Sequence, residues 1–369
     1  MSRTPIPLTR PVGGEQEVEQ VARVIASGQW TGGEAVEAFE QRVAEAVGVR
    51  HAVATTSCTT ALHLVLEALG VGPGDEVVVS DFTFPATANA VLHCGAKPVL
   101  CDVDPASGAM DPQGLEEAIT ERTRAVIVVH PFGIPADMPA INRVAAERGV
   151  AVIEDAACAL GSEIDGRACG AMGVAGCFSF HPRKIISTGE GGMITTDDPH
   201  LASRARALRS HGMIPAKPLP RFPTGGYNYR LSAIAAAVGL AQMDRLEWIL
   251  SRRRALAQIY GELLEPLEWV RPLAPTVQGA LANYQSYVVV LDEGIDRDGL
   301  IKAMAEAGVE TTIGTYAVHA QDYMGSMGYR PGELANSWFL SNHTLTLPLF
   351  PQMAEDQLHE VVQRLARAV

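Results

Sequence analysis

The chain has 369 residues, of which 47% are hydrophobic and 19% charged, and its formal net charge is −13. This composition is typical of a globular enzyme with two or three domains, and it excludes a disordered chain. The negative charge argues against nucleic acid or an anionic membrane as the main partner, but an anionic small-molecule substrate stays open because a pocket can be locally basic.

The cysteines and the start of the chain indicate a cellular compartment. The six cysteines form no C-x-x-C pair and no other metal-ligand spacing, so we expect buried thiols in a reducing compartment and no metal site. The first residues contain no apolar signal core, and no apolar run is long enough to span a bilayer. We therefore expect a cytoplasmic protein without a membrane segment.

Strands and helices alternate along the first two hundred residues, after a turn-rich segment at 1–34 with an irregular loop at Trp30–Gly33. Several strands are near-continuous apolar runs, such as AVIVVH and VAVIED, which is typical of strands covered by helices on both faces. The alternation predicts a parallel sheet with right-handed crossovers. The predicted strands are 51–55, 76–80, 98–103, 125–130, 150–155, 177–180 and 193–196, and the predicted helices are 36–47, 59–69, 85–93, 114–119 and 136–147.

The pattern changes beyond residue 231. Residues 232–264 read as one long helical stretch rich in alanine, leucine and arginine, and a strand is predicted at 285–291. The remainder mixes helices with short strands and ends in a helix at 354–368. We therefore predict an N-terminal segment at 1–34, a large domain at 35–245 and a small C-terminal domain at 246–369.

Polar residues gather where the predicted parallel strands end, which is where open sheets bind ligands. The segment Ser57–Thr60 joins a strand to a helix, and its hydroxyls and free N–H groups suit an anion, although an ordinary N-cap has the same sequence. Asp155 ends the apolar strand VAVIED, where a carboxylate is costly unless it meets a cation or hydrogen-bond donors; a helix cap is the alternative. Phe84 follows another strand and suits either stacking on a planar ligand or the core.

Lys184 lies on a turn between two predicted strands, in the segment GCFSFHPRKIISTGEGGM. Pro182 ends the first strand because it has no N–H for the sheet, and the glycines at 189–192 permit a tight turn. A lysine in such a place is usually a solvated charge. In combination, however, an anion cradle, a buried carboxylate, an aromatic ring and a loop lysine are the parts needed to hold pyridoxal phosphate.

From about Pro5 to its C-terminal helix, the chain resembles the DegT/DnrJ/EryC1/StrS family of sugar aminotransferases, which are fold-type-I pyridoxal-phosphate enzymes. The matching motifs are SCTTALHLVLEALGVGPGDEVVV, FTFPATANAV, VVHPFGIPADM, VIEDAACALG, SFHPRKIISTGEGGM and GYNYRLSAIAAAVGLAQM. The resemblance implies an α/β fold in which a large pyridoxal-phosphate-binding domain has a mainly parallel sheet flanked by helices, and the smaller C-terminal domain is α+β. It also implies pyridoxal 5'-phosphate as the cofactor, with pyridoxamine phosphate as an intermediate.

The resemblance implies roles for individual residues as well. Lys184 would form the Schiff base and shuttle the proton, while Asp155 would pair with the ring nitrogen. Asn228 would reach the phosphate of the neighbouring subunit, which implies a homodimer with shared active sites. The further cofactor contacts implied are Ser57, Cys58, Thr59, Phe84, Cys158 and Ser179; the candidate substrate contacts are Thr31, His181, Arg230 and His319, with a structural role equally open for the histidines and for Arg230.

This sequence departs from the family pattern at three places. The family often has glycine at the position of Cys58, and glutamine or histidine at that of Cys158 near the ring oxygen of the cofactor, so we expect weaker hydrogen bonding to that oxygen. The segment TTIGTYAVHAQ at 311–321 departs from the wording common in the family, so it does not define the substrate.

The expected reaction is ping-pong transfer of an amino group from L-glutamate or glutamine to a keto sugar, which we expect to be a nucleotide-linked keto-deoxyhexose. A lysine at position 184, where dehydrating relatives carry histidine, favours transamination. A keto-cyclitol or other non-nucleotide ketone as acceptor, and a non-catalytic cofactor-binding regulator, stay open. A nicotinamide-dependent oxidoreductase is disfavoured, because the glycines at 70, 72 and 74 precede a strand where a dinucleotide fingerprint follows one.

Overall fold

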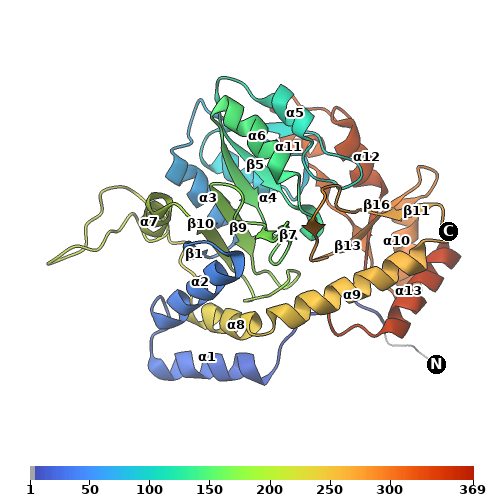
Figure 1. The fold of residues 1–369 in the computed structure, drawn as a ribbon, viewed down its shortest axis with the longest axis horizontal. Helices are drawn as coiled ribbons and strands as arrows, with labels where there is room; N and C mark the ends of the chain where they lie inside the picture. Colours follow the sequence, from blue (N-terminus) through green and yellow to red (C-terminus); the bar gives the residue numbers. More distant parts are fainter. Residues whose placement is uncertain (1–4) are drawn as a thin grey trace.

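The structure, a computed structural model, describes residues 5–369 and centres on a seven-stranded sheet (Figure 1). The strand order is β1-β10-β9-β6-β5-β2-β4; β10 runs antiparallel to both neighbours and every other neighbouring pair is parallel. The mainly parallel sheet is confirmed. Its strands are β1 (His51–Thr55), β2 (Glu76–Ser80), β4 (Lys97–Cys101), β5 (Thr123–Val129), β6 (Ala151–Asp155), β9 (Ala175–Ser179) and β10 (Gly192–Thr196), and all seven were predicted.

Helices cover both faces of this sheet, which explains the near-continuous apolar strands. Along β2, Val78 packs into the core on one face, whereas Val77 and Val79 pack into the core on the other. The first face is covered by α2 (Glu34–Val47), α5 (Pro112–Ala118), α6 (Met138–Arg148) and α8 (Ala233–Met243), and the second by α3 (Cys58–Leu69), α4 (Ala86–His93) and α7 (Pro199–Leu208).

A second, antiparallel sheet lies in the C-terminal part, in the order β11-β13-β16-β14. Its core also contains Ile6, so the chain around this residue, before α1, packs on this sheet. The strands are β11 (Val270–Pro272), β13 (Tyr287–Leu291), β16 (Thr344–Leu347) and β14 (Thr312–Ile313), and the helices beside them are α9 (Leu246–Leu264), α10 (Arg297–Glu306), α12 (Ala335–His343) and α13 (Glu355–Ala368).

One short pair of strands connects the C-terminal part to the central sheet. The pair β15 (Tyr316–Ala317) and β3 (Phe82–Thr83) joins the C-terminal part directly to the end of β2. The remaining elements are α1 (Glu15–Ser27), η1 (Pro131–Gly133), β7 (Glu163–Ile164), β8 (Arg167–Ala168), β12 (Ala280–Leu281), η2 (Val318–Ala320) and α11 (Asp322–Gly325).

Two predictions about the helices are wrong. The segment 1–34, predicted to be turn-rich, contains α1, which packs on α8 (Figure 1). The stretch 232–264, predicted to be one helix, breaks between α8 and α9. The backbone turns at Arg245, whose guanidinium pairs with Glu17 of α1 at 3.1 Å, while Gln242 donates to the same carboxylate at 2.7 Å. Tertiary contacts with α1 thus fix the break, and no proline or glycine marks it.

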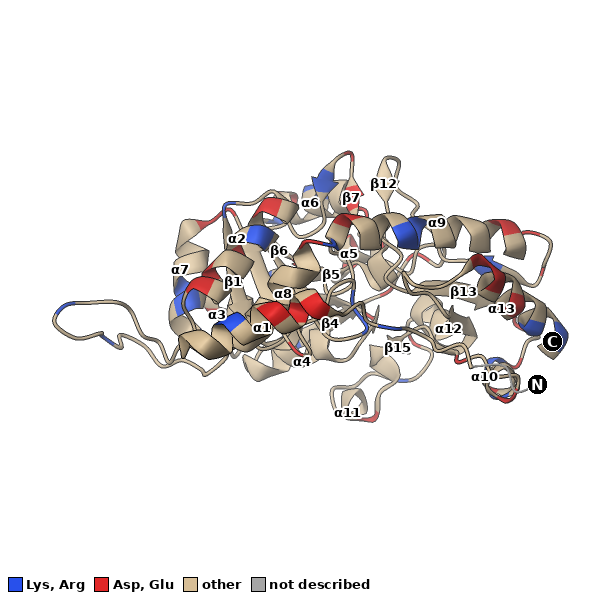
Figure 2. Cartoon of the chain, turned by 90° about the horizontal axis from the view of Figure 1, so that it is seen from below, with Lys and Arg blue, Asp and Glu red and all other residues tan. Residues whose placement is uncertain are grey.

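The proposed domain limits stay predictions. The first turns of α9, with Ile249 and Leu250, pack into the core of the central sheet, and its later turns pack into the C-terminal core. No helix within residues 5–369 is long and apolar enough to cross a membrane. Acidic and basic residues are dispersed over many elements (Figure 2), so the negative net charge does not come from one acidic segment.

A long arm, residues 211–227, leaves the body after α7 and returns before α8 (Figure 1). Its base is closed by a hydrogen bond from His211 N to Tyr227 O at 2.8 Å. Near its tip Leu219 and Phe222 are 73% and 60% exposed. These two side chains give the arm an exposed apolar surface.

Candidate active site

A cavity of about 880 Å³ opens where β5, β6 and β9 end. Adjacent parallel strands bring their carboxyl ends to one edge of the sheet, and the register places Val129 beside Asp155 and Asp155 beside Cys177. The predicted site residues that line this cavity are Ser57, Cys58, Thr59, Phe84, Asp155, Cys158, Ser179, His181 and Lys184.

Lys184 is held by a closed loop that follows β9. Its backbone N–H donates to His181 O at 2.8 Å, and Thr188 N donates to Phe180 O at 2.9 Å. The Nζ atom donates to Cys158 Sγ at 3.1 Å. Burial lowers the pKa of Lys184, but the sulfur of Cys158 and the Asp155 carboxylate outweigh this effect, and the pKa lies above its usual value.

Asp155 is 6% exposed and is fixed by three donors. Thr87 Oγ1 donates to Oδ2 at 2.8 Å, the backbone N–H of Ala157 donates to Oδ1 at 3.2 Å, and the thiol of Cys58 lies 3.8 Å from Oδ1. These donors offset part of the cost of burying a carboxylate. Thr87 is a positioning residue that the sequence analysis missed.

Glu154, the residue before Asp155 on β6, points to the opposite side of the sheet. The carboxylate of Glu154 accepts hydrogen bonds from His130 Nε2 at 2.9 Å and from the backbone N–H groups of Gly170, Met172 and Gly173 at 2.7, 2.6 and 2.6 Å. His130 Nδ1 accepts from Ala136 N at 3.0 Å, so the proton of this ring is on Nε2 and is directed at Glu154. Glu154 therefore anchors the loop after β6 and takes no part in the cavity.

The N-terminus of α3 also lines the cavity, close to Asp155. Ser57 caps this helix, since its Oγ accepts from Thr60 N at 3.2 Å. Cys58 N and Thr59 N have no acceptor within residues 5–369, so they are free for an anion on the axis of the helix dipole. Gly192 is required beside this turn, because a Cβ there would lie 2.3 Å from the carbonyl of Ser57.

Aromatic and histidine side chains complete the rim. Phe84 is 63% exposed, and its ring centroid lies 6.1 Å from that of Tyr316, so one face is free to stack on a planar ligand. His181 lines the cavity beside Lys184, and burial, aided by the nearby cations, lowers its pKa despite the opposing effect of Glu190. We expect a neutral imidazole there at neutral pH.

Four predicted site residues do not line the cavity of this single chain. Thr31 forms a bridge with Ser232, Asn228 is exposed at the base of the arm, and Arg230 donates to Ser210 Oγ at 3.3 Å. His319 is 1% exposed, and both of its ring nitrogens are occupied, by Asp81 Oδ2 at 2.6 Å and by Gly332 N at 3.1 Å. This geometry leaves His319 no free nitrogen for a substrate.

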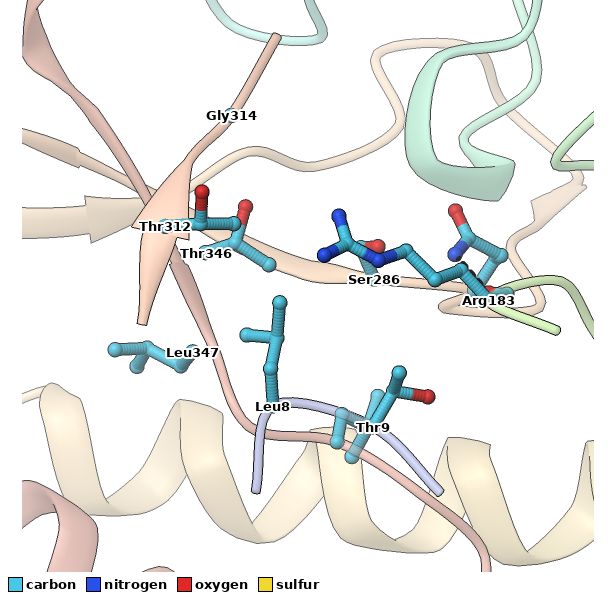
Figure 3. A pocket seen from close by; sticks show the side chains of 10 residues that line it. Leu8, Thr9, Arg183, Ser286, Thr312, Gly314, Thr346 and Leu347 are labelled. Atoms are coloured by element: carbon cyan, nitrogen blue, oxygen red, sulfur yellow. Dashed lines mark hydrogen bonds between the residues drawn. The ribbon is translucent and has the colours of Figure 1, made fainter. Parts of the chain in front are cut away.

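Arg183 was not predicted, although it precedes Lys184 in the chain. It lines both the main cavity and a side cavity of about 70 Å³, together with Gln285, Ser286 and Gly314 (Figure 3). No carboxylate of residues 5–369 pairs with its guanidinium, which points across the side cavity toward Thr346. Gln285 Nε2 donates to the carbonyl of Arg183 at 2.6 Å and so holds its backbone. An unpaired guanidinium at a cavity wall suits a carboxylate or phosphate.

The donor set fits pyridoxal phosphate. Free amides at a helix N-terminus suit its phosphate, an exposed aromatic face suits its ring, a fixed carboxylate suits its pyridinium nitrogen, and a primary amine suits its aldehyde. The fold and the site together therefore define a pyridoxal-phosphate-dependent enzyme.

The comparisons with known proteins identify the family. The sequence model of the DegT/DnrJ/EryC1/StrS aminotransferase family matches residues 11–366, and the chain belongs to this family. It is 38% identical over 374 residues to the spore coat polysaccharide biosynthesis protein SpsC of Bacillus subtilis (strain 168), a match that covers 97% of this chain and 95% of that protein.

Solved structures agree with this assignment. The aminotransferase TlmJ from Streptoalloteichus hindustanus is 37% identical, with a TM-score of 0.93 over 99% of this chain and 98% of that one. Spr1654 from Streptococcus pneumoniae, in its PLP-form, is 26% identical, with a TM-score of 0.93 over 99% of this chain and 100% of that one. The predicted family, fold class, enzyme class and cofactor are thereby confirmed.

Proposed function

We propose that this enzyme transfers an amino group from L-glutamate or glutamine to a nucleotide-linked keto sugar, in two half-reactions that share one cavity. The observation that carries the proposal is the placement of the Lys184 amine and the Asp155 carboxylate on the same cavity, with the free amides of α3 beside them. The polysaccharide role named for the similar SpsC protein supports a sugar acceptor.

The residues of this chain divide the work by position. When bound, pyridoxal phosphate supplies an aldehyde carbon that takes up the amino group and a ring that accepts electron density as a C–H bond breaks. Asp155, held by Thr87, would keep a proton on the ring nitrogen of the cofactor. Lys184 Nζ would hold the aldehyde carbon covalently between turnovers and, once displaced, would move the proton to and from the substrate carbon.

The loop that carries Lys184 also supports this role. Its backbone hydrogen bonds fix the loop while the side chain stays free of any carboxylate partner within 4.0 Å in residues 5–369. A rigid loop with a movable amine is what a proton shuttle between two nearby atoms requires. The contact with Cys158 is one hydrogen bond to a weak acceptor, so it is readily given up.

Arg183 would bind the carboxylate of the amino donor. The amino acid must bring its amino group to the aldehyde carbon held by Lys184, and Arg183 is the next residue on the same loop. The side cavity adds the hydroxyls of Thr312, Thr346 and Ser286 (Figure 3). A guanidinium with hydroxyls around it favours a carboxylate, which can accept two of its N–H groups.

We also propose a homodimer in which each arm completes the partner's cavity. Asn228 lies at the base of the arm, is exposed, and does not reach the cavity of its own chain. The exposed Leu219 and Phe222 give the arm an apolar surface that a second copy would bury. Thr31 and Arg230, which also lie outside the cavity of the single chain, are proposed as substrate contacts in that assembly.

The decisive experiment is the visible absorption spectrum of the holoenzyme before and after addition of L-glutamate. We expect the cofactor band to bleach, and borohydride to fix the cofactor on Lys184 before the donor is added. Lys184→Ala should bind the cofactor without turnover. A band that responds to neither glutamate nor glutamine would contradict the proposed donor and support the non-catalytic regulator. If the band bleaches but the aminated enzyme passes its amino group to none of a panel of nucleotide-linked keto sugars, the proposed acceptor is wrong.

A further inference from the structure

A second group of chemically capable side chains lies away from the cavity, between α3 and the end of α4. His63 and Glu67 stand four residues apart on α3, so they share one face of the helix, and Cys94 follows the last turn of α4. One ligand atom from each of the three residues lies within 4.8 Å of the other two. Imidazole, carboxylate and thiolate are the ligands that zinc takes in proteins.

The imidazole of His63 points an unsatisfied atom into this cluster. His63 is 4% exposed, and its Nε2 is one of the few buried side-chain atoms in residues 5–369 without a hydrogen-bond partner. An unpaired buried nitrogen is costly, and such groups in native proteins require an explanation. The nearest carboxylate oxygen, Glu67 Oε1, lies 3.8 Å away, which is too far for a hydrogen bond but close to the roughly 3.4 Å that separates two ligands of a tetrahedral zinc ion.

The surrounding hydroxyls orient two of the three ligands. Tyr227 donates to Glu67 Oε1 at 3.2 Å, and the Tyr229 hydroxyl lies 3.5 Å from Nδ1 of His63, the other nitrogen of the ring. Metal-bound histidines usually engage their second nitrogen in this way, and bound carboxylates are likewise hydrogen-bonded. Glu67 is partly exposed, so water can reach a fourth position.

A second histidine–glutamate–cysteine cluster in the same chain lacks these properties. His130, Glu154 and Cys169 also lie close together and are fully buried. There, however, the carboxylate already accepts three backbone N–H groups and the His130 proton, and Nδ1 of His130 is occupied. Both nitrogens of that imidazole are engaged, so neither offers a lone pair to a metal ion. The contrast shows that the open nitrogen of His63 is not a general feature of such clusters.

We propose that His63, Glu67 and Cys94 bind one divalent transition-metal ion of the zinc class, with water as the fourth ligand. The ion would have a structural role. It would tie α3, whose first residues would face the cofactor phosphate, to the end of α4 and, through the two tyrosines, to the segment that carries Asn228. The sequence spacing does not reveal this site because Cys94 lies 27 residues beyond Glu67 and is brought beside it only by the fold.

The test is titration of the metal-free holoenzyme with Co²⁺, which reports tetrahedral geometry through visible d–d bands and thiolate ligation through near-ultraviolet charge transfer. We expect one Co²⁺ per chain, displaced by Zn²⁺. Cys94→Ser should remove the charge-transfer band, and His63→Gln and Glu67→Gln should each weaken binding about tenfold or more. Cys101→Ser replaces another buried thiol, outside the cluster, and should leave the Co²⁺ affinity and the charge-transfer band unchanged.

Stability provides the second readout. Zn²⁺ should raise the midpoint of thermal unfolding of the wild-type holoenzyme by a few degrees, and it should not raise that of Cys94→Ser. Absence of Co²⁺ binding, or binding that survives both His63→Gln and Cys94→Ser, would overturn the proposal. The half-reaction with L-glutamate is measured separately, so failure of the metal site leaves the proposed aminotransferase untouched.

Discussion

The wall proposed to hold the cofactor, called the cofactor wall, and the wall proposed to receive the substrates, called the substrate wall, differ in how their charged side chains are paired. The cofactor wall is built on strand ends and on α3, and its carboxylate is already fixed by Thr87 and Ala157. The substrate wall is built on loops, and its guanidinium has no carboxylate partner in residues 5–369. The cofactor wall comprises Ser57, Cys58, Thr59, Thr87, Asp155, Cys158 and Lys184; the substrate wall comprises Arg183, Gln285, Ser286, Gly314 and Thr315.

This difference follows from what each wall binds. The cofactor is the same in every turnover, so a wall whose carboxylate is already fixed would hold it without reorganisation. In the proposed mechanism the two substrates alternate in one cavity, so the wall that receives them would offer groups that are free until a substrate arrives. Substitutions in the cofactor wall should therefore change the chemical step, and substitutions in the substrate wall should change the concentration of substrate required.

The largest effect is expected at Asp155. Asp155→Asn keeps the size of the side chain but removes the negative charge that would hold the proton on the ring nitrogen of the cofactor. We expect the rate of the half-reaction with L-glutamate to fall about 10²- to 10³-fold, as when one preorganised electrostatic group is lost. Stopped-flow absorbance of the cofactor measures the rate of this half-reaction. A rate within a factor of three of wild type would show that Asp155 does not have this role.

A smaller effect on the same step is expected at Thr87. Thr87→Val removes the hydroxyl that donates to Asp155 at 2.8 Å, and a hydrogen bond to a charged group is worth about 1.5–3 kcal/mol, so we expect a loss of roughly tenfold or more in the rate constant. Thr87→Ser keeps the hydroxyl and is the matched control. If the serine variant loses as much as the valine variant, packing of the methyl group, and not the hydrogen bond, is the cause.

Arg183 tests the substrate wall. Arg183→Gln should raise the KM for L-glutamate about tenfold, the value of one charge-assisted hydrogen bond, while kcat and cofactor affinity change little. Arg183→Lys keeps the charge without the planar fork of the guanidinium, so its KM for L-glutamate should lie between those of the wild type and of Arg183→Gln. A rise confined to the KM of the keto-sugar acceptor would assign Arg183 to the other substrate.

The smallest effect is expected at Cys158, one of the two positions, with Cys58, where this cofactor wall departs from the family pattern. Cys158→Gln introduces the residue common in relatives and should strengthen hydrogen bonding to the ring oxygen of the cofactor, which shifts the absorption band and raises cofactor affinity a few-fold. An unchanged spectrum and an unchanged affinity would show that the residue at this position does not contact that oxygen.

Local sequence patterns predicted most of the central sheet and part of the site. Apolar strands bounded by polar ends located Asp155, and the turn before α3 located Ser57, because these features depend on neighbours in the chain. Thr87 and Arg183 carried no such signal. Thr87 lies on a helix 68 residues before the carboxylate that it contacts, and Arg183 is indistinguishable in the sequence from a solvated surface charge.

The sequence by itself determined the family, the cofactor and the alternation of strands and helices, because the repeating apolar pattern and the order of motifs are written along the chain. Only the tertiary structure decided which polar groups are paired. It occupied both nitrogens of His319, left the guanidinium of Arg183 without a carboxylate partner in residues 5–369, ended α8 before Arg245, and brought Cys94 to His63. Pairing depends on distances between residues far apart in sequence, and these distances exist only once the two cores have packed.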